Sequence, residues 1–251
     1  REWFILNALA PSLGLSMDDD ELPFSVKPEE KVDARKVMEL LRSTYEGTEL
    51  DVTRNIKIVN RKGDTIVSPI ANPWMGSTDI ATYNMIAPET VEAMRTVSVS
   101  WCSYSFVTQL RSWMPDEIGG ICWFSVENPG QSPRIPIFTG STKVPSCFEE
   151  CGHNNYNEET LLWRYRKANK LAQIQWGSTK NAMTSSILRY EEKAAKEIPA
   201  LEKEVMALLE EGKKEEAQKL MNRYTIDFEA ATANTWKELE QTFWERFWIN
   251  F

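Results

Sequence analysis

Four cysteines and a single histidine are the side chains with which this sequence could do nucleophilic or metal chemistry. Cys147 and Cys151 are separated by three residues, and His153 follows closely behind them. This spacing suits a disulfide or half of a metal site, but no second cysteine pair stands nearby to complete such a site. We therefore expect plain thiols and no metal, with a disulfide and a zinc site as the alternatives left open.

The lone histidine limits the catalytic mechanisms open to the chain. Ser-His-Asp and Cys-His catalysis each need an imidazole, and metal sites built on several histidines need more than one. These mechanisms are excluded unless His153 serves every role. The sequence also has no phosphate-binding loop, dinucleotide-binding fingerprint, nucleophile elbow or zinc-protease motif. It therefore indicates no cofactor.

Arg111 is the charged residue whose setting the sequence leaves ambiguous. It ends the run SFVTQLR in residues 105–126, a stretch whose apolar ends are typical of strands that enter a core. One interpretation is a charge at a strand end, solvated or paired with Asp116 or Glu117. The other is the buried cation of a functional site.

Composition and charge argue against two classes of partner. The formal net charge is −8, whereas nucleic-acid binding needs a basic stripe. No apolar run approaches the roughly 20 residues that a membrane span needs. The acidic run at residues 18–20 is interpreted as a solvated loop and not as a metal site. We expect neither a nucleic-acid nor a membrane partner.

The first 75 residues mix short helices with loops. Asp33 can cap a helix in residues 27–48, and Gly47 can end it. Pro11 ends a first helix, and Pro23 and Pro28 favour an extended segment. The expected elements are a helix at 1–10, an acidic loop and extended segment at 16–26, a helix at 27–48, and loops with short strands at 49–75, including a hairpin turn at 60–65.

The middle of the chain predicts an antiparallel sheet. Three stretches are rich in β-branched and aromatic residues and are separated by Pro and Gly: residues 96–110, 118–126 and 133–140. Their hydrophobic residues occur on both sides of the alternation. We therefore expect strands that are buried on both faces, as in a layer between other layers.

A helical period begins at Asn157 and continues to the end of the chain. Asn157 is the expected cap of the first of these helices, with glutamates in its first turn. Pro199 and Gly212 are expected to interrupt the later ones, giving helices at 157–177, 178–198, 199–211 and 213–248. The sequence thus divides into a sheet-rich portion, 1–156, and a helical portion, 157–251, packed on it.

Several stretches carry a resemblance to a known family. PFSVKPEEKVDARKVMELLRSTYEGTELDVT (23–53), SYSFVTQLRSWMPDEIGGICWFSVENP (103–129) and PIFTGSTKVP (136–145) occur in the family's order, and LLWRYRKANKLAQIQW (161–176) is similar to the helix that follows. Together they resemble the bacterial dipeptidase family of cysteine N-terminal-nucleophile (Ntn) hydrolases, relatives of penicillin V acylase and bile-salt hydrolase.

The resemblance implies a fold and a mechanism. The fold class is α+β: part of an αββα sandwich with antiparallel sheets and a long C-terminal helical region. The reaction is amide hydrolysis by a cysteine whose own free α-amino group acts as the base. An α-amine titrates near pH 8, about the range needed to take a thiol proton without a histidine.

The chain departs from the family where the nucleophile must stand. Residue 1 is Arg1, and the family's early arginine and aspartate are missing as well. We therefore expect a C-terminal portion of such an enzyme, inactive alone, whose partner is the missing N-terminal segment. The missing segment is expected to leave an exposed sheet edge or apolar groove that favours self-association into a homo-oligomer.

Two site residues follow from the resemblance. Arg111 matches an arginine that lies near the nucleophile in the acylase relatives, where it would contact the thiolate or the substrate carboxylate. Asn72, in IANPWM, matches an asparagine that donates to the oxyanion. The plainer interpretations are a strand-end arginine and an Asn-Pro turn.

Two functions from different classes remain open. One is a dipeptidase or acyl-amide hydrolase acting on dipeptides or small acyl-amides. The other is a catalytically inactive peptide-binding or scaffold homologue. The sequence leaves the compartment undecided between periplasmic or secreted and cytoplasmic.

Overall fold

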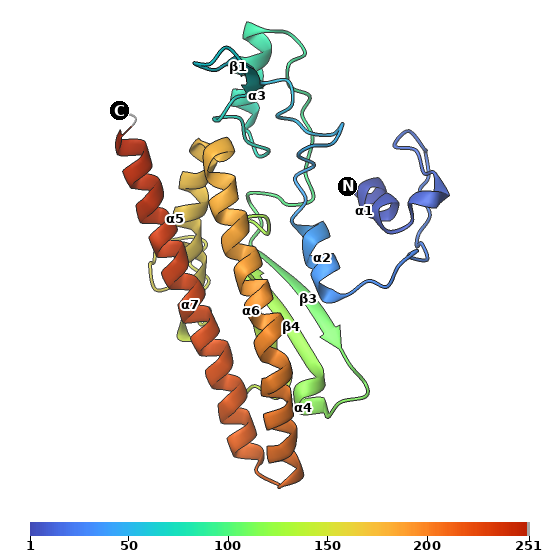
Figure 1. The fold of residues 1–251 in the computed structure, drawn as a ribbon, viewed down its shortest axis with the longest axis vertical. Helices are drawn as coiled ribbons and strands as arrows, with labels where there is room; N and C mark the ends of the chain where they lie inside the picture. The colour runs from blue at the N-terminus through green and yellow to red at the C-terminus, as the bar shows by residue number, and fades with distance from the viewer. Residues whose placement is uncertain (250–251) are drawn as a thin grey trace.

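A computed structural model describes residues 1–249 of the chain, and it shows a mixed α+β fold (Figure 1). Two small antiparallel sheets are followed by long helices, as the α+β class predicts. In chain order the elements are α1 (Glu2–Leu9), η1 (Pro11–Leu13), α2 (Ala34–Leu41), β1 (Lys57–Val59), β2 (Thr65–Val67), α3 (Ser77–Ile86), β3 (Tyr104–Leu110), α4 (Asp116–Gly119), β4 (Gly120–Val126), β5 (Ile135–Phe138), η2 (Ser146–Phe148), α5 (Leu161–Ile174), α6 (Trp176–Glu210) and α7 (Lys214–Ile249).

The three predicted stretches each contain a strand, and the strands form one antiparallel sheet in the order β3-β4-β5. The first strand begins only at Tyr104, so the prediction of a strand at residues 96–103 is wrong. β3 pairs with β4 from Tyr104 opposite Val126 to Leu110 opposite Gly120. β4 pairs with β5, with Phe124 opposite Ile135. Because side chains alternate between faces, this register places Ser105, Ser125 and Arg134 in one row on the same face. β3 is an edge strand.

One face of the sheet is covered by helices. α6 and α7 run side by side along the molecule, and α5 lies against α7 (Figure 1). α2 packs against β3. The largest side chains buried between the sheet and these helices include Trp236, Tyr165, Phe243, Ile118 and Met183. The long helices are therefore stabilised by the apolar face that they share with the sheet.

The opposite face of β3 is open, so the prediction of burial on both faces is wrong for this strand. Tyr104, Phe106 and Leu110 are 58%, 54% and 73% exposed. β4 and β5 are mostly buried. The physical reason is that the long helices pack on the other face. On this face Tyr104 contacts the ring of Phe124 and lines a cleft with Phe148 of η2, while all three side chains stay more than half exposed.

The helix predicted at residues 27–48 is shorter than expected. Asp33 caps it as predicted, its carboxylate accepting from the Lys36 amide at 2.7 Å, so residues 27–33 lie outside it. The helix ends at Leu41 and not at Gly47. Tyr45 already has a positive φ of 64°, which a helix cannot contain. Gly47, with φ 81°, belongs to the turn that follows.

Two predicted helix boundaries in the C-terminal half are also wrong. Thr160, and not Asn157, precedes the first turn of α5, while the Asn157 side chain accepts from the Glu159 amide in the turn before it. Pro199 lies inside the continuous helix α6. Packing keeps that helix together, because Ile198, Leu201 and Val205 are buried on either side of the proline. Gly212 does separate α6 from α7, as predicted.

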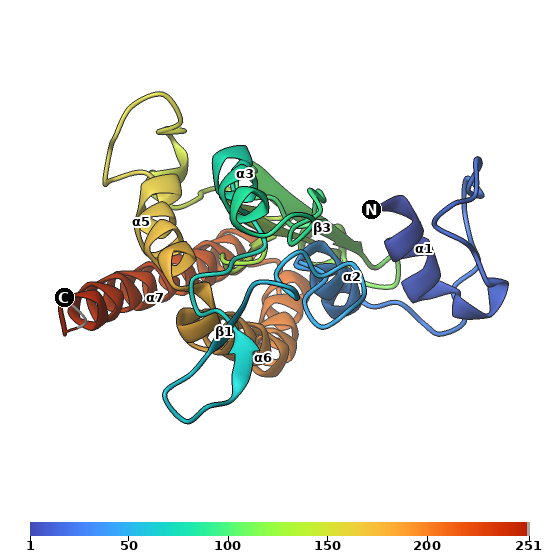
Figure 2. The same cartoon turned by 90° about the horizontal axis from the view of Figure 1, so that it is seen from above.

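The segment before the sheet forms a smaller unit of its own. β1 and β2 form the predicted hairpin, with Gly63 in its turn. The helix α3 was not expected. Ile56, Ala71 and Val91 form a second, small apolar cluster here. This segment contacts the start of α6, where the Gly177 amide donates to the Pro69 oxygen at 3.0 Å. Seen from above, α1 lies towards one side of the molecule and the C-terminal end of α7 lies at the other (Figure 2).

Among residues 1–249 we find no helix that combines the length and the apolar character needed to cross a bilayer.

Candidate functional site

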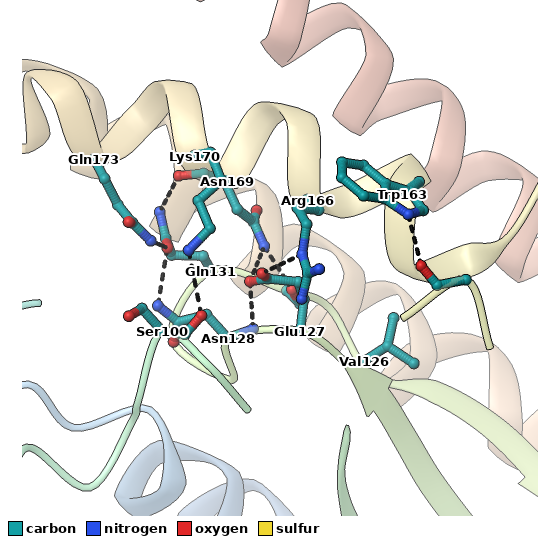
Figure 3. A network of polar contacts seen from close by, with 12 residues as sticks. Ser100, Val126, Glu127, Asn128, Gln131, Trp163, Arg166, Asn169, Lys170 and Gln173 are labelled. Atoms are coloured by element: carbon teal, nitrogen blue, oxygen red, sulfur yellow. Dashed lines mark hydrogen bonds and ion pairs between the residues drawn. The ribbon is translucent and has the colours of Figure 1, made fainter. Parts of the chain in front are cut away.

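A buried polar loop joins β4 to β5. Residues 127–134, with the sequence ENPGQSPR, are all buried except Gly130, which is half-buried. Connecting loops normally lie on the surface, because their backbone and polar side chains need partners. A buried loop of this composition therefore requires a dense hydrogen-bond network, and the structure shows one (Figure 3).

Glu127 opens this loop and is held in an unusual backbone conformation. Its φ is 65°, and it is fully buried. The carboxylate accepts from the Asn128 amide at 2.7 Å, from Arg166 Nε at 2.9 Å and from Asn169 Nδ2 at 3.4 Å (Figure 3). Arg166 and Asn169 both come from α5. The pair with Arg166 compensates the buried charge, so Glu127 ties the end of β4 to α5.

Gln131 extends the network to the other helices. Its side-chain oxygen accepts from Asn128 Nδ2 at 2.9 Å and from Gln173 Nε2 at 2.7 Å (Figure 3). Its backbone oxygen accepts from the indole of Trp236 on α7 at 3.1 Å. Each of these groups has a partner, and satisfied buried networks of this kind make a structure rigid. This part of the loop is a scaffold.

Arg134 is the last residue of the loop and, unlike Glu127 and Gln131, is not fully hydrogen-bonded within the described residues. Its side chain is among the buried ones, with 3% of the residue exposed. Nη2 donates to Ser105 Oγ at 3.0 Å, across the small Ser125 on the middle strand. Nε and Nη1 have no hydrogen-bond partner among residues 1–249. Buried guanidinium groups are normally paired, so these two donors point to an anionic partner that the described chain does not supply.

The charged groups around Arg134 carry more positive than negative charge. The neighbouring ion pair joins Arg42 to Glu191 of α6, so two guanidinium groups share one carboxylate. Burial, together with the nearby Arg42 cation, lowers the pKa of Arg134 to about 10. A lowered pKa means that the charged form is disfavoured where it stands. The place therefore favours the arrival of a negative charge.

A cleft of 230 Å³ begins at Glu191 and extends along the sheet, and Arg134 itself is not part of its lining. It lies between α2 and α6, and Glu191 belongs to its lining. Trp123 and Ile121 of β4 contribute apolar surface, and Arg111 lies at the far end. The residues that line it are Asp33, Ala34, Arg35, Met38, Gln109, Arg111, Ile121, Trp123, Glu191, Ala194, Ala195, Ile198, Pro199 and Glu202.

Arg111 lies in this cleft with its donors in use. Its side chain is 13% exposed and donates to Glu202 of α6 at 2.5 Å. It also donates to the carbonyl oxygens of Ile118 at 3.0 Å and Gly119 at 3.3 Å. Its ion-pair partner is thus neither Asp116 nor Glu117. The catalytic role assigned to it stays a prediction.

Asn72 lies elsewhere. Its Nδ2 donates to the backbone oxygen of Gln173 at 3.3 Å, and its Oδ1 accepts from the Trp74 amide at 2.9 Å. Gln173 lies in the last turn of α5, so these contacts place Asn72 at the junction of α5 and α6, whereas Arg111 contacts Glu202 in the second half of α6. At about 1.5 Å per residue, the part of α6 from its start to Glu202 is roughly 40 Å long. The structure does not bring the two predicted residues together.

The four cysteines are all free, and three have thiols that are hard to ionise. Burial raises the pKa of Cys102 and of Cys122. Burial and the nearby Glu229 carboxylate raise the pKa of Cys147 to about 12. A thiol with such a pKa is a poor nucleophile near neutral pH. Cys151 is exposed and lines a second cleft with Cys147 and His153.

Sequence reasoning missed Arg134. In SPRIPIF it resembles a solvated charge at a strand start. The available signal was the pair of serines, Ser105 and Ser125, inside otherwise apolar strands. Small side chains in adjacent strands leave room for a long one to cross, but this inference needs the strand register.

Comparison with known proteins identifies the family. Residues 1–189 match Peptidase family C69. The chain is also 22% identical over 182 residues to a protein of Latilactobacillus sakei described as "Probable dipeptidase". That match covers 72% of this chain and 32% of the relative, so the chain spans about a third of the length of this curated relative. The chain belongs to Peptidase family C69.

Proposed function

We propose that this chain is part of a dipeptidase-like amide hydrolase whose nucleophile is a cysteine with a free α-amino group. The observation that carries the proposal is the family match over residues 1–189. A C69 peptidase is a hydrolase of peptide bonds. The dipeptide as substrate comes from the name of a relative that this chain matches in part.

The nucleophile of the proposed reaction is not one of the cysteines seen here. Each of the four is preceded by another residue, so its nitrogen belongs to a peptide bond and is no base. The raised pKa of Cys147 supports the same conclusion. Hydrolysis needs a nucleophile, a base in reach and an oxyanion donor. We therefore propose that residues 1–251 alone do not turn over dipeptides.

The open face of β3 supports a sandwich as the architecture of the longer protein. Tyr104, Phe106 and Leu110 form an exposed apolar row on one face of the sheet, and helices cover the other. Apolar rows of this kind are normally buried against another layer. We propose that a further sheet of the αββα sandwich covers it.

The test compares two proteins under reducing conditions. One is residues 1–251, and the other is a longer protein that contains them and begins with a processed cysteine. Release of free amino acids from a dipeptide panel is measured for both. We expect turnover in the longer protein only, and complete loss when its first cysteine is replaced by serine.

Cys147→Ser and Cys151→Ser serve as matched controls in the longer protein and should leave turnover unchanged. Turnover by residues 1–251 that either substitution abolishes contradicts the proposal. Absence of turnover in both proteins, with dipeptide binding retained, favours the inactive peptide-binding homologue instead.

A further inference from the structure

Arg134 is a buried cation whose charge the described chain leaves uncompensated. Its nearest charged neighbours are Arg42 and Glu191, which already pair with each other. The next carboxylate along the loop, Glu127, is paired with Arg166. Three guanidinium groups therefore face two carboxylates. Because an unpaired buried charge is costly, retaining one implies a partner that is absent from the described residues.

The guanidinium keeps one fork of donors that a carboxylate can use. A guanidinium presents adjacent N–H groups in a planar fork, which matches the two oxygens of a carboxylate. Nη2 is fixed by Ser105 Oγ at 3.0 Å, while Nε and Nη1 remain unpartnered among residues 1–249. Both forks of a guanidinium include Nη2, which has two hydrogens, so a carboxylate can pair with the second Nη2 hydrogen beside Nε or Nη1 while the first stays with Ser105.

The guanidinium lies close to an approach from solvent. It reaches Ser105, which is on the edge strand β3 and is half-buried. The half-buried Cys102 lies nearby. An anion that binds the buried Nε or Nη1 therefore has to enter beside the half-buried Ser105 and Cys102.

The adjoining cleft favours a short peptide over a bare anion. Trp123, in its lining, is one strand row beyond the row of Arg134, because it pairs with Pro136. Successive rows on one face are about 7 Å apart, which is close to the length of one extended dipeptide. The cleft volume of 230 Å³ suits a ligand of that size. Its apolar floor can cover a side chain while the carboxylate meets the cation.

We propose that Arg134 and Ser105 form the subsite for the C-terminal carboxylate of a short peptide, with the peptide body along Trp123 in the cleft between α2 and α6. The proposal rests on the proposed function for the class of ligand. It makes Arg134 a residue for substrate selection, which requires a free C-terminal carboxylate.

Equilibrium binding tests this subsite without hydrolysis. Isothermal titration of residues 1–251 with the dipeptide Gly-Leu, with its C-terminal amide, and with acetate gives three dissociation constants. We expect the amide and acetate to bind at least about 10-fold more weakly than the dipeptide, the scale of a lost charge-assisted contact. Arg134→Gln should weaken dipeptide binding by a similar factor.

Two further variants serve as controls for the charge and for the fold. Arg134→Lys retains the charge but loses the fork, so it should also weaken binding and leave the fold intact. Arg223→Gln removes an exposed arginine of α7 and should change nothing. Equal binding of the amide or of acetate, unchanged binding in both Arg134 variants, or no binding at all overturns the proposal. If the longer protein turns over dipeptides and any of these results is found, the proposed hydrolase function is retained and only this subsite is disproved.

Discussion

Two largely buried arginines lie near the two ends of β3, Arg111 after Leu110 and Arg134 against Ser105, and they differ in what surrounds them. Arg111 donates to Glu202 and to two backbone carbonyls, so its charge and its donors are accounted for. Arg134 is more deeply buried, yet it has one partner, Ser105, which is neutral. The first arginine fastens the end of the sheet to α6. Arg134 has donors left to bind an anion.

The difference teaches that burial alone does not mark a functional cation. Both arginines are largely buried, and burial costs each the same kind of hydration. What separates them is whether the chain supplies the compensating acceptors. A satisfied buried pair belongs to the fold, and a cation left unsatisfied requires a ligand or a further part of the protein.

The largest expected change in the free energy of unfolding is at Arg111. Arg111→Met leaves the Glu202 carboxylate without a cation at a site where both side chains are mostly buried. We expect a loss of about 3 kcal/mol in the free energy of unfolding, measured by urea denaturation. Glu202→Gln and the double variant complete a mutant cycle. A loss below about 0.5 kcal/mol would show that the pair does not fasten the sheet.

At Arg134 we expect a smaller change in the free energy of unfolding, in the direction of greater stability. Arg134→Met removes a buried charge that lacks a counter-ion, so the free energy of unfolding should stay the same or rise by about 1 kcal/mol. Urea denaturation under identical conditions provides the comparison with Arg111→Met. A loss of about 2 kcal/mol or more would mean that Arg134 also holds the fold together.

The smallest expected change in the free energy of unfolding concerns the hydrogen bond from Arg134 to Ser105. Ser105→Ala removes the acceptor at Nη2 and should cost about 1 kcal/mol or less in the free energy of unfolding. The half-buried position allows water to replace the hydroxyl. A cost above that of Arg111→Met would indicate that Ser105 and Arg134 have a structural role larger than the one inferred here.

Much of the fold could be predicted from residue patterns. β-branched and aromatic runs located the three strands, and the turn residues before Thr65 located the hairpin. The helix ends were less accurate, because they depend on packing. Pro199 did not end α6, since buried neighbours hold the helix on both sides. The open face of β3 depended on sheet order, which no local pattern contains.

The candidate site was less accessible to sequence reasoning. Resemblance selected Arg111 and Asn72, which the fold separates: Asn72 lies at the junction of α5 and α6, and Arg111 lies beside Glu202 in the second half of α6. Arg134 depends on a register that sets Ser105 and Ser125 beside it, and on helices that bring Arg42 and Glu191 over it. Both are tertiary properties. Charge balance at a buried position becomes visible only once the partners are known.

The most direct measurement sets the two arginines against each other in catalysis. In a longer protein that turns over dipeptides, kcat/KM is measured for a dipeptide and for its C-terminal amide, with Arg111→Met and Arg134→Met as the variants. We predict that Arg134→Met removes the preference for the free carboxylate, while Arg111→Met keeps that preference even where both rates fall. The opposite result, a preference lost with Arg111→Met and kept with Arg134→Met, would contradict this account.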